Sequence, residues 1–207
     1  LKMNYKLEPI VDLTESIIGY EILTEVDSFS SFNSLKKCEK MKILKEQIKI
    51  AENISNTNNN ILISINLDSS TIFDVSEDEK CLSRLKKTPN IRLEINEDIK
   101  IKPIEFQKLM KCFDGIFLWL DDFDDKQEWR LINLKNIEAI KIDKYFLWGN
   151  EATTRFSNLV KTINIAGKKI ICEGVNTSLR VDYLKSFNIW GMQGYLYPKT
   201  NIRLSSQ

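Results

Sequence analysis

Polar side chains follow the ends of successive apolar runs along this sequence, where they could bind a metal ion. They are Glu21 in GYEIL, Asn66 in ILISIN, Glu94 in IRLEIN, Asp121 and Asp122 in IFLWLDD, Lys141 in AIKID, Glu173 in KIICEG and Gln193 in the last run. A carboxylate is not buried beside several others unless positive charge neutralises it. Because carboxylate and amide oxygens suit hard cations, the pattern predicts a site for a divalent ion such as Mg²⁺ or Mn²⁺.

The adjacent pair Asp121 and Asp122 carries the most specific chemistry in this set. Neighbouring side chains of a strand point to opposite faces, so both can reach one site only where the strand turns out into its loop. One carboxylate could then bridge two ions roughly 3.5 to 4 Å apart, which suits in-line attack on a phosphodiester. Asp124 and Asp125 lie beyond the apolar run, and we expect them in a solvated loop.

Each of these residues taken alone has a simpler explanation. A carboxylate beside a strand end is commonly a helix cap or a turn former. An ordinary barrel whose carboxylates only cap its helices therefore stays open as a hypothesis. Six strands that each supply a carboxylate, an amide or a lysine at the corresponding place favour a shared site instead.

Strand-like and helix-like segments alternate along the chain and must position these residues. The expected strands are 5–13, 17–24, 61–67, 91–95, 116–121, 139–142, 169–172 and 190–196. The expected helices are 32–54, 77–85, 103–113, 129–134, 153–165 and 178–187. This alternation predicts a parallel sheet with helical crossovers, and eight strands favour a closed TIM-like (β/α)8 barrel. Active sites of such barrels lie at the C-terminal ends of the strands.

The first two expected strands are joined by Thr14, Glu15 and Ser16 alone. This connection is too short for a helical crossover, so the two strands should form a hairpin. The α/β barrel is therefore expected to contain one antiparallel strand. We expect one barrel domain over residues 3–205, because the length suffices for one sizeable core.

The composition argues against several classes of function. The 30 basic and 29 acidic side chains leave a net charge of +1, so we expect neither nucleic acid nor an anionic membrane as a direct partner. There is no apolar run of about eighteen residues and no leader segment, so a cytoplasmic protein without a membrane span is expected. The absence of histidine and of CxxC spacing excludes the usual zinc sites and histidine-activated nucleophiles.

Seven short motifs occur in order in the expected strands: YEIL, SINL, LEINE, DDF, KID, CEGV and QGY. From LEPIVDL to QGYLYPK, nearly the whole chain resembles the EAL family of bacterial cyclic di-GMP phosphodiesterases. The resemblance implies a TIM-barrel variant with one antiparallel strand. It also implies hydrolysis of one phosphodiester of cyclic di-GMP to linear pGpG with two Mg²⁺ or Mn²⁺ ions. In the family this reaction lowers a second messenger that controls motility, adhesion and biofilm formation.

The resemblance further implies a role for individual residues. The metal ligands would be Glu21, Asn66, Glu94, Asp121, Asp122 and Glu173. The catalytic set would be Glu21, Asp121, Lys141 and Gln193, and the substrate contacts would be Glu8, Leu23 and Gln193. Within these sets, Lys141 would contact the attacking water and Gln193 would lie close to that water and the ions. Glu97 matches a glutamate that steadies the loop after the DD pair from outside the ligand shell.

Several positions depart from the family pattern. Glu25 stands where the family commonly has a phosphate-binding arginine, and Glu8 stands where it has a glutamine that contacts guanine. A carboxylate can accept hydrogen bonds from guanine N1 and N2, whereas a carboxylate beside a phosphate is repulsive. DFDDKQEWR replaces a Gly/Ser-rich loop that the family links to metal binding and dimerisation, and Asn176 replaces a glutamate.

Two functional hypotheses from different classes stay open. The first is a working cyclic di-GMP phosphodiesterase, because every metal ligand and the lysine are present. The second is a catalytically weak or inactive relative that acts as a cyclic di-GMP receptor or a protein-binding regulator, which Glu25 and the altered loop favour. Because no sensor domain is recognisable, regulation is expected through expression, a homodimer or a regulatory protein partner.

Overall fold

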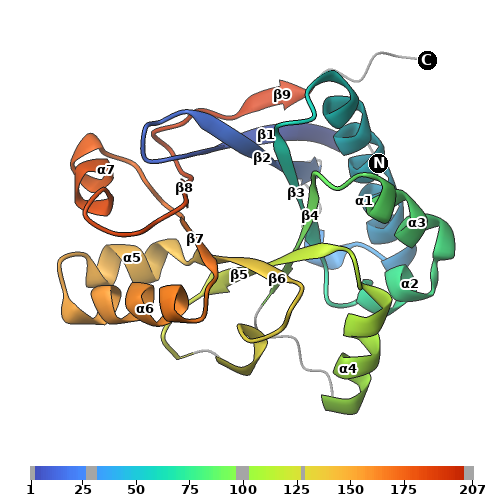
Figure 1. Ribbon diagram of the computed structural model, residues 1–207. Coiled ribbons are helices and arrows are strands. Elements are labelled where there is room, and N and C mark those ends of the chain that lie inside the picture. The colour runs from blue at the N-terminus through green and yellow to red at the C-terminus, as the bar shows by residue number, and fades with distance from the viewer. Residues whose placement is uncertain (1–2, 27–31, 97–102, 127–128, 203–207) are drawn as a thin grey trace.

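The computed structural model of the chain contains a closed ring of eight strands, with a ninth strand beside the first (Figure 1). It describes residues 3–26, 32–96, 103–126 and 129–202. The strands are β1 (Met3–Val11), β2 (Ile17–Val26), β3 (Leu62–Leu67), β4 (Ile91–Asn96), β5 (Phe117–Phe123), β6 (Ile137–Ile142), β7 (Lys169–Cys172), β8 (Gly191–Met192) and β9 (Thr200–Ile202). Strands β2 to β8 run parallel, and β1 closes the ring by antiparallel pairing with β2 and β8. The predicted barrel with one antiparallel strand in its ring is confirmed.

The β1–β2 hairpin has the short connection that the sequence indicated. The Asp12 carboxylate accepts backbone hydrogen bonds from Thr14 at 2.8 Å and from Ser16 at 3.0 Å, and Glu15 has a positive φ of 63°. An aspartate that bonds the backbone of the following residues stabilises such a turn. The hairpin continues into the long pairing of β1 with β2, in which Glu8 lies opposite Glu21. This register places the side chains of Glu8 and Glu21 on the same face of the sheet.

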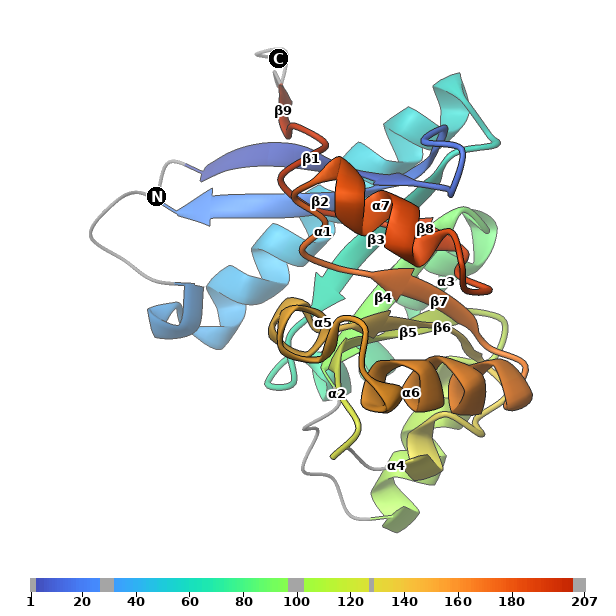
Figure 2. The same ribbon diagram turned by 90° about the vertical axis from the view of Figure 1, so that its left-hand side faces the viewer.

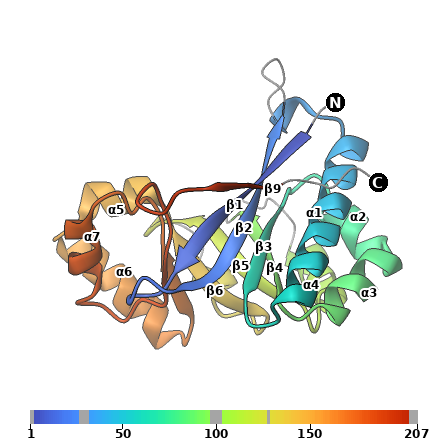
Figure 3. The same ribbon diagram turned by 90° about the horizontal axis from the view of Figure 1, so that it is seen from above.

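Helices occupy two opposite sides of the strand ring (Figures 1 and 3). One group contains α1 (Lys37–Thr57), α2 (Ile72–Glu77), α3 (Glu79–Lys87) and α4 (Pro103–Cys112). The other contains α5 (Lys144–Asn150), α6 (Thr154–Ile165) and α7 (Ser178–Leu184), and 3-10 turns occur at Phe32–Ser34 and Trp129–Leu131. The short helices α2 and α5 were not predicted, because neither is long enough to show a helical period. α5 begins where Asp143 caps it by accepting from Phe146 N at 2.8 Å.

Strand β9 was also not predicted. It is three residues long and pairs antiparallel with β1, so that Leu7 lies opposite Thr200. Figure 2 shows β9 above β1, close to the C-terminal end of the chain. The sequence 190–196, predicted as one strand, forms only the two-residue β8 and then turns away. Edge pairing of this kind depends on contacts between distant parts of the chain, so no local pattern reveals it.

The barrel interior is filled in layers. Its apolar middle contains Ile10, Trp119, Ala139 and Ile171, with Leu62 and Trp190 packed against them. Below this layer, at the N-terminal ends of the strands, Arg92 makes an ion pair with Glu138 at 2.5 Å. Among the described residues the barrel therefore has a packed core, and its open end lies at the C-terminal ends of the strands.

Within the described part of the chain, no helix has both the length and the apolar character needed to cross a bilayer. All four cysteines are free thiols: Cys81 and Cys172 are buried, Cys112 is partly buried and Cys38 is exposed.

Candidate active site

The alternation of side chains along the strands brings most of the predicted residues into one layer above the apolar core. On β5, Asp121 comes two residues after the buried Trp119, and Glu173 follows Ile171 of β7 in the same way. Because the side-chain period of a strand is two, each of these residues faces the same interior as the core residue before it. We call the carboxylates gathered here the acidic cluster, which consists of Glu21, Glu94, Asp121, Asp122 and Glu173.

Lys141 lies at the centre of this layer, with a side chain that is only 1% exposed. Its Nζ is 3.1 Å from Glu21, 2.8 Å from Glu94, 3.0 Å from Asp121 and 2.9 Å from Glu173. Burial alone would lower the pKa of Lys141, but the four carboxylates outweigh burial and hold that pKa well above its ordinary value. Lys141 is therefore a fixed positive charge at the centre of the site.

Glu21 is held in place by donors from three strands or strand ends. Asn66 Nδ2 donates to its Oε1 at 2.6 Å, and Gln193 Nε2 donates to its Oε2 at 2.7 Å. Burial would raise the pKa of Glu21, but Lys141 and the two amides together lower it below its ordinary value. The protein thus stabilises the charged form of Glu21.

Asp121 and Asp122 reach the site where β5 leaves regular geometry. The pairing register of β5 shifts between Leu120 and Phe123, and Asp122 has a φ of 53°. Aspartate tolerates this left-handed conformation better than most residues. Carboxylate oxygens of Asp121, Asp122 and Glu173 lie within 4.8 Å of one another. The structure therefore brings both aspartates to one place, at the turn out of the strand where the sequence required it.

The acidic cluster holds five carboxylates around one ammonium group, and its electrostatics reflect this excess. Burial, followed by repulsion from Glu21, raises the pKa of Glu94 well above its ordinary value. Burial likewise raises the pKa of Glu173 to about 8, although Lys141 opposes the shift. The pKa of Asp122 is raised by desolvation and by the charge of Asp121. Additional positive charge at the cluster would therefore favour the ionised forms of Glu94, Asp122 and Glu173.

The residues present fit a divalent cation. Glu94 Oε1 and Gln193 Oε1 are buried and accept no hydrogen bond within the described residues. Buried oxygen atoms without a donor are rare in proteins and need an explanation. The donor set consists of carboxylate and amide oxygens, which select hard ions such as Mg²⁺ and Mn²⁺. A metal ion would provide both the missing positive charge and the missing partners.

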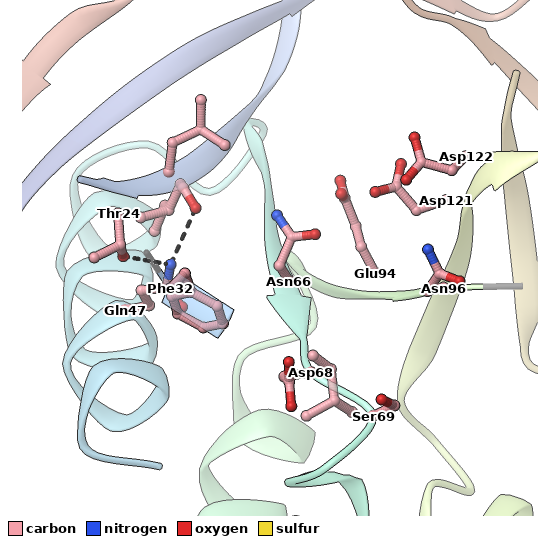
Figure 4. A pocket seen from close by; sticks show the side chains of 13 residues that line it. Thr24, Phe32, Gln47, Asn66, Asp68, Ser69, Glu94, Asn96, Asp121 and Asp122 are labelled. Atoms are coloured by element: carbon pink, nitrogen blue, oxygen red, sulfur yellow. Dashed lines mark hydrogen bonds between the residues drawn. The ribbon is translucent and has the colours of Figure 1, made fainter. Parts of the chain in front are cut away.

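Two pockets open on either side of the acidic cluster. The Phe32 pocket, about 420 Å³ in volume, is lined by Ile22, Leu23, Thr24, Phe32, Gln47, Asn66, Leu67, Asp68, Ser69, Glu94, Asn96, Asp121 and Asp122. The Lys199 pocket, about 180 Å³, is lined by Glu8, Glu21, Leu23, Lys144, Glu173, Gly174, Gln193, Gly194, Tyr195 and Lys199. Figure 4 shows the carboxylates of Glu94, Asp121 and Asp122 grouped on one side of the Phe32 pocket, with Phe32 and Gln47 on the other. A ligand with two arms could therefore lie across the acidic cluster.

The predicted substrate contacts all border these pockets. Leu23 lines both pockets, while Glu8 and Gln193 line the Lys199 pocket. Glu25, the residue in place of the family's arginine, lines neither pocket and pairs with Lys6 at 2.5 Å. Glu97, predicted to steady the loop after the DD pair, lies outside the described residues.

The segment after the DD pair is tied to a neighbouring helix. Asp125 makes two contacts with the guanidinium group of Arg155 on α6, at 2.5 and 2.6 Å. These contacts are solvent-exposed, so the segment is both solvated and anchored to α6. Asn176 is exposed and accepts a hydrogen bond from Arg180 at 2.5 Å.

Sequence reasoning missed several residues that line the pockets, chiefly Phe32, Gln47, Lys144, Tyr195 and Lys199. Lys144 directly follows the KID motif, which is the one local signal that could have identified it. Phe32 and Gln47 lie within the expected helix 32–54, Tyr195 is the last residue of the QGY motif, and Lys199 lies beyond the last expected strand. Gln47 is buried and donates to Ile22 O and Thr24 Oγ1 at 3.1 Å each.

Comparisons with known proteins agree with this arrangement. A model of the EAL domain family matches residues 2–200. The cyclic di-GMP phosphodiesterase PdeH of Escherichia coli (strain K12) is 26% identical over 192 residues, which cover 84% of this chain and 74% of PdeH. A family match over nearly the whole chain also confirms the resemblance on which the residue roles were predicted.

Solved structures share the fold at lower identity. The EAL-like domain protein YdiV gives a TM-score of 0.82 at 17% identity, covering 96% of this chain and 92% of that chain. A manganese and cyclic di-GMP complex of Klebsiella pneumoniae BlrP1 gives 0.78 at 17% identity, covering 97% of this chain and 56% of that chain. With the family model matched over residues 2–200 and the barrel shared with these structures, the chain belongs to the EAL domain family.

Proposed function

We propose that this protein is a metal-dependent phosphodiesterase that hydrolyses cyclic di-GMP to linear pGpG. The observation that carries the proposal is the acidic cluster around Lys141, placed between two pockets at the open end of the barrel. Cyclic di-GMP has a guanine on each side of a ring that contains two phosphodiesters. A ligand of that form can place one base in each pocket and a phosphodiester above the acidic cluster.

The predicted metal ligands are Glu21, Asn66, Glu94, Asp121, Asp122 and Glu173. Two divalent ions held there would supply Lewis-acid stabilisation for the charge that develops on the phosphodiester oxygens. The buried Oε1 of Glu94, which accepts no hydrogen bond from any described residue, supports this assignment. The preferred ion is Mg²⁺ or Mn²⁺, because all of these ligand atoms are oxygen.

The chain's own residues have separate tasks in the proposed reaction. Lys141 is the fixed cation that can donate a hydrogen bond to the attacking water and orient it toward phosphorus. Gln193 holds Glu21 through its amide and leaves its buried Oε1 available to the same water. Attack by water breaks one phosphorus–oxygen bond, so the product keeps one phosphodiester and gains a terminal phosphate.

Substrate contacts are proposed for Glu8, Leu23 and Gln193. All three line the Lys199 pocket, and Leu23 also lines the Phe32 pocket, so its side chain borders both arms of a bound ligand. By lowering the concentration of cyclic di-GMP, such an enzyme would affect motility, adhesion and biofilm formation. A homodimer or a regulatory protein partner is compatible with this proposal. The mass of the protein in solution tests whether such an assembly forms.

A second function, binding without turnover, has one observation in its favour. Glu25 carries a negative charge at a position where the family commonly has a phosphate-binding arginine. Its carboxylate makes an ion pair with Lys6. A receptor or a protein-binding regulator would need the fold and the pockets but no intact metal site. Retention of every predicted metal ligand favours hydrolysis over this second function.

The test is chromatography of cyclic di-GMP after incubation with the purified protein in Mg²⁺ or Mn²⁺, beside Glu21→Ala and Lys141→Ala variants. We expect linear pGpG from the intact protein, and none from the variants or from protein treated with a chelator. Binding is measured in parallel by calorimetry. Unchanged substrate in both metals would overturn the enzymatic proposal, and tight binding without product would establish the receptor instead.

A further inference from the structure

We propose that Glu8 and Lys199 act as one hydrogen-bonding pair that reads the edge of a guanine base in the Lys199 pocket. The proposal deepens the proposed function and rests on it. It assigns a ligand-contacting role to Lys199, and it explains how a carboxylate at Glu8 can serve in the recognition of guanine.

The fold holds the two side chains together at the pocket. Lys199 Nζ lies 2.7 Å from Glu8 Oε2, and the two side chains are 39% and 12% exposed. In the antiparallel pairing of β1 with β9, Leu7 lies opposite Thr200. This pairing brings their chain neighbours, Glu8 and Lys199, beside each other. The short strand β9 therefore fixes Lys199 against Glu8.

The pair also lies directly beside the reaction centre. Glu8 is opposite Glu21 in the β1–β2 hairpin, so both side chains face the interior of the same pocket. Glu173 and Gln193 line this pocket as well. A base bound by Glu8 and Lys199 would thus belong to a nucleotide that also reaches the acidic cluster.

Guanine offers the pattern of groups that this pair can bind. Its edge presents the acceptor O6 beside the donors N1–H and N2–H₂. The carboxylate of Glu8 can accept from both donors, and the ammonium of Lys199 can donate to O6. Adenine presents an acceptor at N1, which would face the carboxylate, and a donor at N6, which would face the ammonium. The pair therefore selects guanine against adenine.

A glutamine side chain carries an acceptor and a donor within one amide group. Glu8 and Lys199 together present the same two functions from two side chains. This equivalence makes the proposal testable by exchange: a glutamine at position 8 should make Lys199 dispensable, whereas any other neutral residue at position 8 should not.

The experiment compares four proteins: wild type, Lys199→Met, the double variant Glu8→Gln with Lys199→Met, and the double variant Glu8→Leu with Lys199→Met. KM, kcat and calorimetric affinity are measured with cyclic di-GMP, with cyclic di-IMP, which lacks the N2 amino group, and with cyclic di-AMP. The control is Lys185→Met, which removes the lysine of the exposed ion pair between Lys185 and Asp182. Circular dichroism checks that each variant is folded.

We expect Lys199→Met to raise KM for cyclic di-GMP by about tenfold with little change in kcat, since a good bidentate base contact has that order of effect. The Glu8→Gln double variant should regain wild-type KM, and the Glu8→Leu double variant should not. Wild type should bind cyclic di-IMP less tightly than cyclic di-GMP, and cyclic di-AMP least.

Three results would overturn the inference. An unchanged KM in Lys199→Met would remove Lys199 from recognition. Equal recovery in the two double variants would mean that the pair acts only through its charge. Equal affinity of the wild type for guanine and adenine ligands would remove base reading altogether. Failure of the proposed function looks different, because the wild type would then leave cyclic di-GMP unhydrolysed, whatever its affinity for the guanine and adenine ligands.

Discussion

The ammonium group of Lys141 lies 2.8 Å from Oε2 of Glu94, and both side chains are almost completely removed from solvent. The other oxygen of Glu94 accepts no hydrogen bond from the described residues. One buried cation therefore satisfies half of this carboxylate and leaves the other half for a second positive group. We therefore expect the stability of the protein to depend jointly on Lys141 and on any metal ion bound at this carboxylate.

Replacing Lys141 with Met should destabilise the metal-free protein. Four carboxylates lose their common cation, and removal of one partner from a buried ion pair costs about 3 to 5 kcal/mol in the free energy of unfolding. Mn²⁺ should then raise the melting temperature of Lys141→Met more than that of wild type, because the ion replaces the missing charge. Thermal unfolding with and without Mn²⁺ measures both effects.

The control for this experiment is Lys185→Met, whose lysine makes an exposed ion pair with Asp182. Its unfolding free energy should change by less than about 1 kcal/mol, and its response to Mn²⁺ should match that of wild type. An equal Mn²⁺ shift in Lys141→Met and wild type would contradict the view that lysine and metal neutralise the same carboxylates.

Replacing Asn66 with Asp removes the donor that lies 2.6 Å from Glu21 Oε1 and adds another carboxylate to the acidic cluster. The metal-free protein should lose about 1 to 3 kcal/mol of stability, because a buried acceptor loses its partner. Activity should fall about 10- to 100-fold, the usual effect of disturbing a group that orients a metal ligand. Urea unfolding and the hydrolysis assay test these outcomes.

Asn133→Asp offers a matched change at an exposed position. If Asn66→Asp lowered activity no more than Asn133→Asp does, the Asn66 amide would have no part in holding Glu21. Because the new carboxylate also adds an anionic oxygen, the half-saturating concentration of Mn²⁺ should decrease in Asn66→Asp.

Much of the site could be predicted because its residues obey one local rule. Asp121, Lys141 and Glu173 each come two positions after an apolar residue that faces the barrel core, so the strand period alone aligns them. The hairpin was equally local, since a connection of three residues permits little else. Secondary structure is predicted most directly from a single sequence where the hydrophobic pattern is periodic and the connections are short.

What the sequence did not reveal depends on contacts between distant segments. Glu8 meets Lys199 only because β9 pairs with β1, and Arg92 meets Glu138 only because the barrel closes around Trp119. None of these pairs leaves a pattern along the chain. The positive φ of Asp122 was likewise not predictable, since it accompanies a register shift between β5 and β6 that only the folded sheet defines.

Replacing Glu25 with Gln should lower KM for cyclic di-GMP only slightly. Four residues along a strand separate Glu25 from Glu21, a distance of about 13 Å, at which unit charges in water interact by about 0.3 kcal/mol. The expected change is therefore less than about twofold, and salt should abolish it. KM measured at low and high ionic strength provides the test.

A decrease of tenfold or more in KM for cyclic di-GMP in Glu25→Gln would instead indicate that a substrate phosphate lies directly against this position. Lys6→Met is the companion variant, since Lys6 pairs with Glu25 at 2.5 Å. If Glu25 acts only through its long-range charge, Lys6→Met should raise KM by a similar small factor, and the double variant should match wild type.

The ion pair at the lower end of the barrel should make stability depend on acid pH. Burial would raise the pKa of Glu138, but hydrogen bonds from Arg92 and Trp119 outweigh burial and lower the pKa from 4.5 to about 2. A carboxylate with a lowered pKa stabilises the fold fully above its unfolded value and loses this contribution as pH falls from about 4.5 to about 2. Glu138→Gln should therefore cost about 2 kcal/mol near pH 7, after allowance for solvent screening, and this difference from wild type should vanish near pH 2. Urea unfolding of both proteins across this range measures the difference, and a cost that stays constant with pH would show that Glu138 contributes through packing and not through its charge.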